Sequence, residues 1–152
     1  KEVLREVNEA EFYAQLKQVR EQCGDRAVLR AIHYFDENRR VLEQVQALKN
    51  GDFDGFLAGV RASGRSSWML LQNIIPLGST AHQQMALAQA LCEKLLDGRG
   101  ACRVHGGGFA GTILAFVPDE MLEQFRSGAE AVLGAGSCHV LSIRQTGGTR
   151  LG

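Results

Sequence analysis

The sequence has 152 residues, of which 45% are hydrophobic, and this is enough to bury the core of one domain of ordinary size. Its 17 Lys and Arg residues balance its 17 Asp and Glu residues, which argues against a nucleic acid or an anionic membrane surface as a partner. The apolar runs are far shorter than the ~20 residues that a membrane span needs. No charged-then-apolar signal segment opens the chain, so we expect a cytoplasmic location.

The four cysteines show no metal-binding pattern. Cys23, Cys92, Cys102 and Cys138 are widely spaced, and no CxxC pair or histidine lies near them at zinc-finger spacing. We therefore predict reduced, mostly buried thiols and no metal site.

The first half of the chain is predicted to be helical. Between Gly24 and Gly51 apolar residues recur at near-helical spacing among charged ones, with Asp25 as the N-cap and Gly51 as the stop. A second helix begins at the cap Asp52 and fades near residues 63–64. The opening KEVLREV is also helix-like and has no Met, which suggests a piece of a longer polypeptide.

The second half is predicted to mix helices and strands. Pro76 and Gly78 require a loop after about residue 71, and Ser79 or Thr80 then starts a third helix that Gly98 ends. The short β-branched and apolar runs ACRVH, TILAFV and SCHVLSI are typical of strands. A helix beginning at residue 118 or 119 separates the last two of them, so the order is α–β–β–α–β in one open sheet with helices on one face.

The loop GGGFAG, between the first two predicted strands, is the most informative segment. Gly106, Gly108 and Gly111 match GxGxxG, but that dinucleotide motif must open a helix, whereas residues 112–117 are a β-type run. The other phosphate motif, GxxxxGK[ST], lacks its lysine here. The glycines could form a concave backbone nest that approaches a phosphate or substrate, or simply a roomy hairpin, and composition favours neither.

Other polar residues near the loop have two interpretations. Arg103 and His105 are expected on the same face of the first strand. They are either contacts for an anion or substrate or ordinary half-exposed strand residues. His33 is interpreted as a packing residue of the first long helix. The charged residues Arg30, Arg39 and Arg40 are interpreted as its solvated face. The order of residues shows no Ser/His/Asp or Cys/His constellation, so we assign no catalytic residue.

The segment RVHGGGFAGTILAFV resembles the third conserved motif of the GHMP sugar kinases, in the form found in galactokinases. KEVLREV and DRAVLRAIHYFDENRRV resemble segments that open the C-terminal half of galactokinases, so the resemblance runs from Lys1 to about Leu151. It implies an α+β domain, residues 1–152, that is the C-terminal half of a two-domain kinase. Residues 1–71 would be its helical part and residues 79–150 its αββαβ part, with an antiparallel sheet of three to four strands.

The resemblance also implies a function. Such a kinase transfers the γ-phosphoryl group of ATP to the anomeric hydroxyl of galactose, and an N-terminal domain outside this chain would hold ATP, Mg²⁺, most sugar contacts and the catalytic groups. The chain alone should then be inactive. The third motif would pack against the phosphate-binding loop of that domain, through Gly106, Gly107, Gly108, Phe109, Ala110 and Gly111.

The sequence also departs from the family pattern. RASGRSS and LQNIIPLGSTAHQQ stand where many galactokinases have a Ser-His pair and a Ser-Cys-Pro-Glu-Leu-Asp stretch. Three alternatives therefore stay open beside a galactokinase. They are a GHMP kinase for a different sugar, a non-catalytic sensor of sugar and nucleotide, and a structural domain in which the glycines only connect strands.

Overall fold

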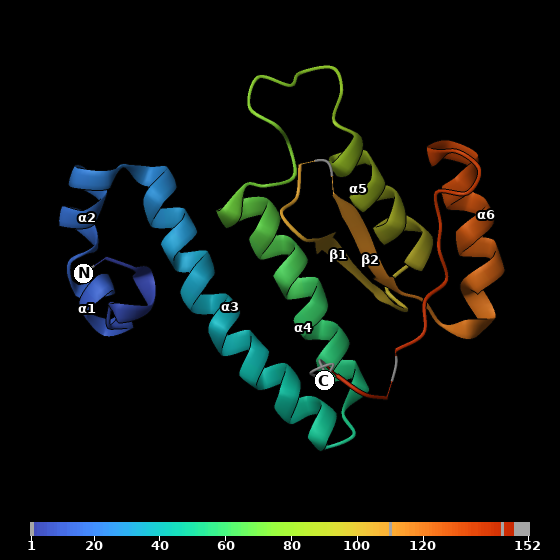
Figure 1. The fold of residues 1–152 in the computed structure, drawn as a ribbon, viewed down its shortest axis with the longest axis horizontal. Coiled ribbons are helices and arrows are strands. Elements are labelled where there is room, and N and C mark those ends of the chain that lie inside the picture. Colours follow the sequence, from blue (N-terminus) through green and yellow to red (C-terminus); the bar gives the residue numbers. More distant parts are fainter. Residues whose placement is uncertain (1, 110, 144, 148–152) are drawn as a thin grey trace, which may run out of the picture.

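The structure, a computed structural model, describes residues 2–109, 111–143 and 145–147 and is an α+β arrangement dominated by helices (Figure 1). The fold class predicted from the sequence is therefore confirmed at this level. The α-helices are α1 (Glu9–Ala14), α2 (Leu16–Cys23), α3 (Asp25–Lys49), α4 (Phe53–Ser66), α5 (Gln84–Leu96) and α6 (Leu122–Leu133). The remaining elements are 3₁₀ turns at Leu4–Glu6 and Asp119–Met121, a π-helical turn at Ser67–Leu71, and strands β1 (Ala101–His105) and β2 (Thr112–Phe116).

Local capping explains where several helices begin. Asp52 caps α4 as predicted, because its carboxylate accepts the backbone N–H of Gly55 at 2.8 Å. Asp25 is instead the first residue of α3, preceded by Gly24 at φ 81°, and its carboxylate pairs with Arg20. The predicted start of the third helix at residue 79 or 80 is wrong. The carbonyl oxygen of Ser79 accepts a hydrogen bond from the side-chain amide of Gln83, and the hydroxyl of Ser79 donates one to the carbonyl of His82. These two bonds hold residues 79–83 as a loop.

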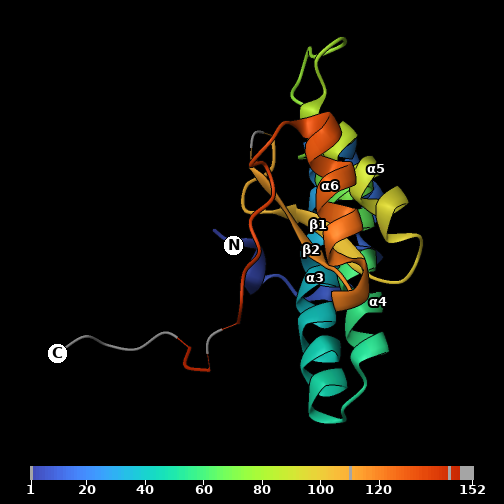
Figure 2. The ribbon, with the colours of Figure 1, turned by 90° about the vertical axis from the view of Figure 1, so that its right-hand side faces the viewer.

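The sheet among the described residues has two antiparallel strands, β1 and β2, with Ala101 opposite Phe116 and His105 opposite Thr112. The prediction of a third strand at residues 137–143, and of a sheet of three to four strands, is therefore corrected. In this segment Leu141 is 79% and Ile143 is 90% exposed. Figure 2 shows it as an extended segment along one side of the molecule, and it pairs with neither β1 nor β2 in the sheet of the described residues. β-propensity alone does not make a strand when no neighbour accepts its backbone hydrogen bonds.

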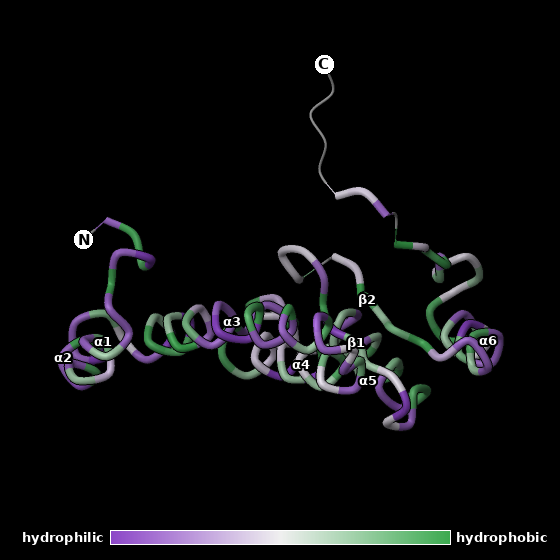
Figure 3. The backbone as a smooth tube through the Cα atoms, turned by 90° about the horizontal axis from the view of Figure 1, so that it is seen from below, coloured by the Kyte–Doolittle hydropathy of each residue, from purple (hydrophilic) through white to green (hydrophobic). Residues whose placement is uncertain are grey.

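The hydrophobic core is divided into four small clusters along the molecule. Seen from below, the helices lie in a row from α1 and α2 at one end to α6 at the other (Figure 3). The clusters are Phe12, Val28, Ala31 and Phe35; Leu57, Val60 and Ala101; Ile74, Met85, Ala86 and Val104; and Cys92, Leu96, Cys102 and Phe125. Three of the four clusters include β1 residues, so the hairpin is held from α4 on one side and from α5 and α6 on the other.

Two of the four cysteines belong to this core. Burial raises the pKa of Cys92 to about 11 and that of Cys102 to about 12, so both are inert thiols at neutral pH. Cys23 is exposed and Cys138 is half-buried, and all four are free thiols. Among the helices that the structure describes, none is long and apolar enough to cross a membrane.

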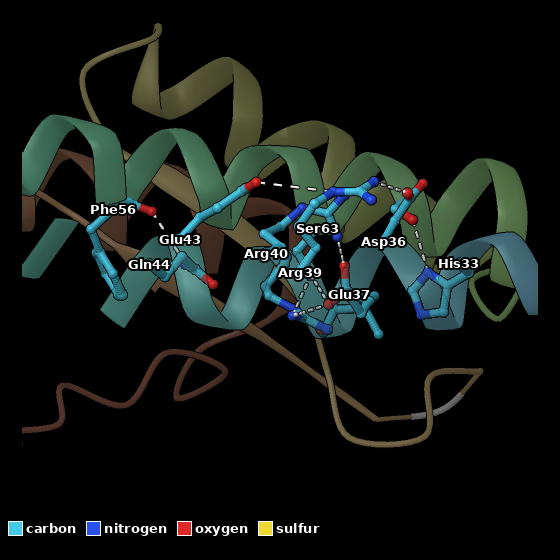
Figure 4. A network of polar contacts seen from close by, with 12 residues as sticks. His33, Asp36, Glu37, Arg39, Arg40, Glu43, Gln44, Phe56 and Ser63 are labelled. Atoms are coloured by element: carbon cyan, nitrogen blue, oxygen red, sulfur yellow. Dashed lines mark hydrogen bonds and ion pairs between the residues drawn. The ribbon is translucent and has the colours of Figure 1, made fainter. Parts of the chain in front are cut away.

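A polar network centred on Glu37 joins α3 and α4 to β1 (Figure 4). The Glu37 carboxylate accepts hydrogen bonds from Ser63 Oγ at 2.7 Å and from Arg103 Nη1 at 3.5 Å, and it also pairs with Arg40. Arg103 donates a second hydrogen bond to Ser63. Burial lowers the pKa of both arginines, as expected for cations that are partly removed from water. Glu37 therefore offsets two partly buried positive charges at the junction of three elements.

We expect Glu37→Ala to destabilise the fold by about 2 kcal/mol, because it leaves Arg40 and Arg103 without their shared counterion. The matched control is Glu43→Ala on the same helix, since Glu43 is 66% exposed and lies 4.0 Å from Arg39. That control should cost less than about 0.5 kcal/mol. Urea unfolding followed by circular dichroism would measure both values, and equal losses would contradict the role given to Glu37.

Candidate functional site

The glycine loop is a six-residue connection, residues 106–111, between the paired ends of β1 and β2. The sequence prediction that it joins two strands, and does not open a helix, is confirmed. Its backbone is left-handed at three described positions, with φ of 76° at Gly106, 81° at Gly108 and 55° at Phe109. Such a φ is unusual for an aromatic residue, so Phe109 needs local contacts that hold it there.

Those contacts come from Asn73, in the segment that follows α4 and the π-helical turn. The backbone N–H of Phe109 donates to the carbonyl oxygen of Asn73 at 2.7 Å. The Asn73 side chain donates from Nδ2 to the carbonyl oxygen of Gly107 at 3.3 Å. The glycine loop is thus bonded to a residue 34 positions earlier in the chain.

Gly108 is required by this close approach. A Cβ atom at residue 108 would lie 2.1 Å from the carbonyl oxygen of Asn73 and 2.7 Å from its Nδ2. Gly106 and Gly107 differ, because a Cβ atom on either would meet no heavy atom of the described residues within 4 Å. The loop therefore has one glycine fixed by an internal contact and two whose missing side chains leave open space. Ala110, also part of the predicted site, lies outside the described residues.

The end of the loop turns back on itself. Gly111 donates its N–H to the carbonyl oxygen of Gly108 at 3.0 Å, so the N–H groups of Phe109 and Gly111 are both used inside the protein. These two donors are not directed at a ligand. A nest of N–H groups around a phosphate would have to rely on the remaining amides of the loop.

The two other predicted contact residues have different surroundings. The guanidinium of Arg103 is held by Glu37 and Ser63, in the network between β1 and the helices. His105 is exposed at the end of β1. Their proposed contact with a substrate stays a prediction, and Arg103 has in addition a structural role that the sequence did not indicate.

His33 packs between helices, in line with its interpretation from the sequence. Its Nδ1 lies 2.8 Å from Ser66 Oγ, at the C-terminal end of α4. Burial, followed by the nearby charges of Arg40 and Arg103, lowers the pKa of His33. The imidazole is therefore neutral at physiological pH and joins α3 to α4.

Sequence reasoning missed Asn73 altogether. The stretch SSWMLLQN has no clean apolar period, and the structure explains this with a π-helical turn at Ser67–Leu71 followed by Gln72 at φ 57°. π-helical turns and left-handed non-glycine residues gather at functional sites. The loss of periodicity is therefore the one signal in the sequence that could have directed attention to this segment.

The surface of the described part of the chain includes two hollows of note. One, of about 180 Å³, is lined by Trp68, Gln72, Ile74 and Ile75, the neighbours of Asn73. The other, of about 550 Å³, is lined by residues of α5 alone. The first is smaller than the 300–1,000 Å³ of typical small-molecule sites, and neither is lined by a residue of the glycine loop. No described group of three His, Cys, Asp or Glu residues is placed to hold a metal ion.

Comparison with curated proteins finds several galactokinases. The chain is 32% identical to the galactokinase of Actinobacillus pleuropneumoniae over 126 residues, which are 81% of this chain and 30% of that protein. It is 31% identical to the galactokinase of Glaesserella parasuis over 123 residues, again 81% of this chain and 30% of that protein. For Haemophilus influenzae galactokinase the identity is 32% over 100 residues, 66% of this chain and 24% of that protein.

The chain thus spans about 30% of the length of the first two relatives. No family model matches the sequence. No solved structure matches it either.

Substitution of the loop glycines by alanine should separate their roles. We expect Gly108→Ala to destabilise the fold by about 2 to 4 kcal/mol, because the new methyl group meets the Asn73 carbonyl and alanine disfavours the left-handed backbone. Gly107→Ala should change stability by less than about 0.5 kcal/mol, since its methyl group meets open space. Thermal and chemical unfolding of both variants would test this, and a Gly108→Ala protein as stable as the Gly107→Ala protein would refute the contact.

Proposed function

This chain is a galactokinase-like sequence, and from that premise we propose that it is the C-terminal domain of a two-domain sugar kinase of the GHMP family. The complete polypeptide would transfer the γ-phosphoryl group of ATP to the anomeric hydroxyl of galactose. The glycine loop would form part of the wall of the cleft between the two domains. The observation that carries this role is the open space beside Gly106 and Gly107.

The loop can serve as a backbone wall. Without side chains at residues 106 and 107, a segment of another domain can approach the main chain directly. Asn73 and Gly108 meanwhile hold the inner side of the loop against the protein. The N–H groups of Phe109 and Gly111 are used internally, which favours packing against a phosphate-binding loop over direct donation to a phosphate.

Phosphoryl transfer suits such a division of labour. Catalysis of this reaction consists mainly of positioning and electrostatic stabilisation, so a rigid wall that excludes water and fixes the phosphate loop contributes without an acid or a base. The described residues offer no carboxylate cluster for Mg²⁺, and the hollow beside Asn73 is too small for a nucleotide. We therefore assign ATP, Mg²⁺ and most sugar contacts to the rest of the polypeptide, and no catalytic residue to this chain.

The primary test is the activity of the complete polypeptide with MgATP and a panel of sugars. We expect phosphorylation of galactose at its anomeric position, detected by phosphorus-31 NMR. Residues 1–152 alone should show no turnover. Other sugars are included because the sequence departs from the galactokinase pattern at residues 61–67, at the end of α4, and at residues 71–84, up to the first residue of α5. Turnover of another sugar only would make it a kinase of different specificity, and binding without turnover would make it a sensor. Galactokinase-like turnover by residues 1–152 alone would contradict the proposed division of labour.

The wall role makes a separate prediction for Gly107→Val in the complete polypeptide. The valine side chain would enter the open space beside the loop, so we expect kcat to fall at least about tenfold while stability stays within about 0.5 kcal/mol of wild type. Ala14→Val is the matched control, because Ala14 is an exposed small residue at the end of α1, far from the loop (Figure 1). Full activity of Gly107→Val would mean that the glycines only connect strands.

A further inference from the structure

Asn73 enters the protein in an unusual way. The π-helical turn ends at Leu71 and is followed by Gln72, which has a left-handed backbone. The next residue, Asn73, is only 6% exposed. A π-helical turn and a left-handed non-glycine residue are both local departures from the most stable backbone. The chain maintains both of them immediately before this one buried amide.

Asn73 contacts the glycine loop on both sides of Gly108. Its side chain binds the carbonyl of Gly107, and its own carbonyl binds the N–H of Phe109, the residue with the unfavourable φ. These contacts fix two successive peptide groups of the loop relative to the helical half of the molecule. Removal of the side-chain contact would leave the loop tied by a single backbone hydrogen bond to this segment.

The Asn73 side chain is not explained by stability. Its Oδ1 is buried and has no hydrogen-bond partner among the described residues. A buried acceptor without a partner is destabilising, and an apolar residue of similar size would remove that cost. Among the described residues, the one contact that distinguishes asparagine from such a residue is the donation from Nδ2 to the loop.

We infer that Asn73 is a positioning residue of the phosphoryl-transfer site. It holds residues 107–109 in the geometry that the wall of the cleft requires, at some cost in stability. This inference rests on the proposed function for its kinetic consequence, and it has a structural consequence that holds without any substrate. A displacement of ~1 Å can lower a rate about a hundredfold when groups must be aligned for reaction.

Asn73→Leu in the complete polypeptide is the test, with Gln89→Leu as the matched control. Gln89 is also a buried amide whose Nε2 donates to a β1 carbonyl, that of Cys102, at 3.3 Å and whose Oε1 has no partner among the described residues. Its contact lies in the middle of β1, outside the loop. Gln89 Nε2 also donates to Glu93 Oε1 at 3.0 Å, so Gln89→Leu removes one buried amide contact to the hairpin, as Asn73→Leu does, and in addition a contact within α5.

The expected result has two parts. Asn73→Leu should lower kcat with MgATP and galactose at least about tenfold, with KM for galactose within about twofold of wild type and thermal stability close to that of Gln89→Leu. Hydrogen exchange at the Phe109 amide should become about tenfold faster in Asn73→Leu and stay unchanged in Gln89→Leu. Asn73→Ala, which removes the donor without adding bulk or charge, should reproduce both effects and serves if the leucine variant does not fold.

Two outcomes would overturn the inference. Unchanged kcat together with unchanged exchange at Phe109 in the Asn73 variants would show that the side chain does not position the loop. A loss of stability in Asn73→Leu that alone accounts for the loss of activity would show a structural role. If the wild-type polypeptide phosphorylates no sugar, the proposed function fails, and exchange at the Phe109 amide still decides whether Asn73 holds the loop.

Discussion

The approach of the Asn73 carbonyl to the backbone at Gly108 is the constraint on which the site depends. The two residues come from opposite halves of the chain, and their contact leaves no room for a side chain at residue 108. The Asn73 segment leaves the end of α4, and α4 is tied to α3 and β1 by Glu37 and by the His33–Ser66 contact. The position of the glycine loop is therefore set by a continuous series of contacts through the helical half of the molecule.

This arrangement divides the glycines into two groups with different physical reasons. Gly106 and Gly108 have internal reasons, because Gly106 has a left-handed backbone with φ 76° and the protein itself occupies the space beside Gly108, whereas Gly107 is small although no described atom lies near its Cβ position. Neither internal packing nor a left-handed backbone accounts for Gly107. A surface that is kept free of side chains and rigid from within is suited to contact with another backbone, and this is the physical basis of the kinase-domain proposal.

The sequence predicted the elements whose signals are local. The periodicity of residues 25–50, the cap Asp52 and the β-type runs on either side of the glycines all lie where α3, α4, β1 and β2 form. The apolar stripe of α3 was identified correctly as helical. Its first part, Val28 and Phe35, is buried, while Leu42 and Leu48 are 71% and 52% exposed. Periodicity shows that a helix has an apolar face, and it does not show which part of that face meets a neighbour.

Features that depend on distant segments could not be predicted from the sequence. Residues 137–143 have strand-like composition but lack a neighbouring strand among the described residues, and Arg103 has strand-like spacing but is engaged by Glu37 of α3. The role of Asn73 depends on a contact across 34 residues and on a π-helical turn that has no simple sequence pattern. The resemblance of the chain to galactokinases, by contrast, rested on local motifs, the glycine loop together with the two helical segments, and galactokinases 32% identical over 81% of the chain confirm it.

Hydrogen exchange of the loop amides in the complete polypeptide, with and without MgATP, tests the central claim most directly. If residues 106–109 form a wall against which the phosphate-binding loop closes, their amides should exchange more slowly when MgATP is bound, while amides in the distant helices α1 and α2 keep their rates. Unchanged exchange at residues 106–109 in a polypeptide saturated with MgATP would contradict the account.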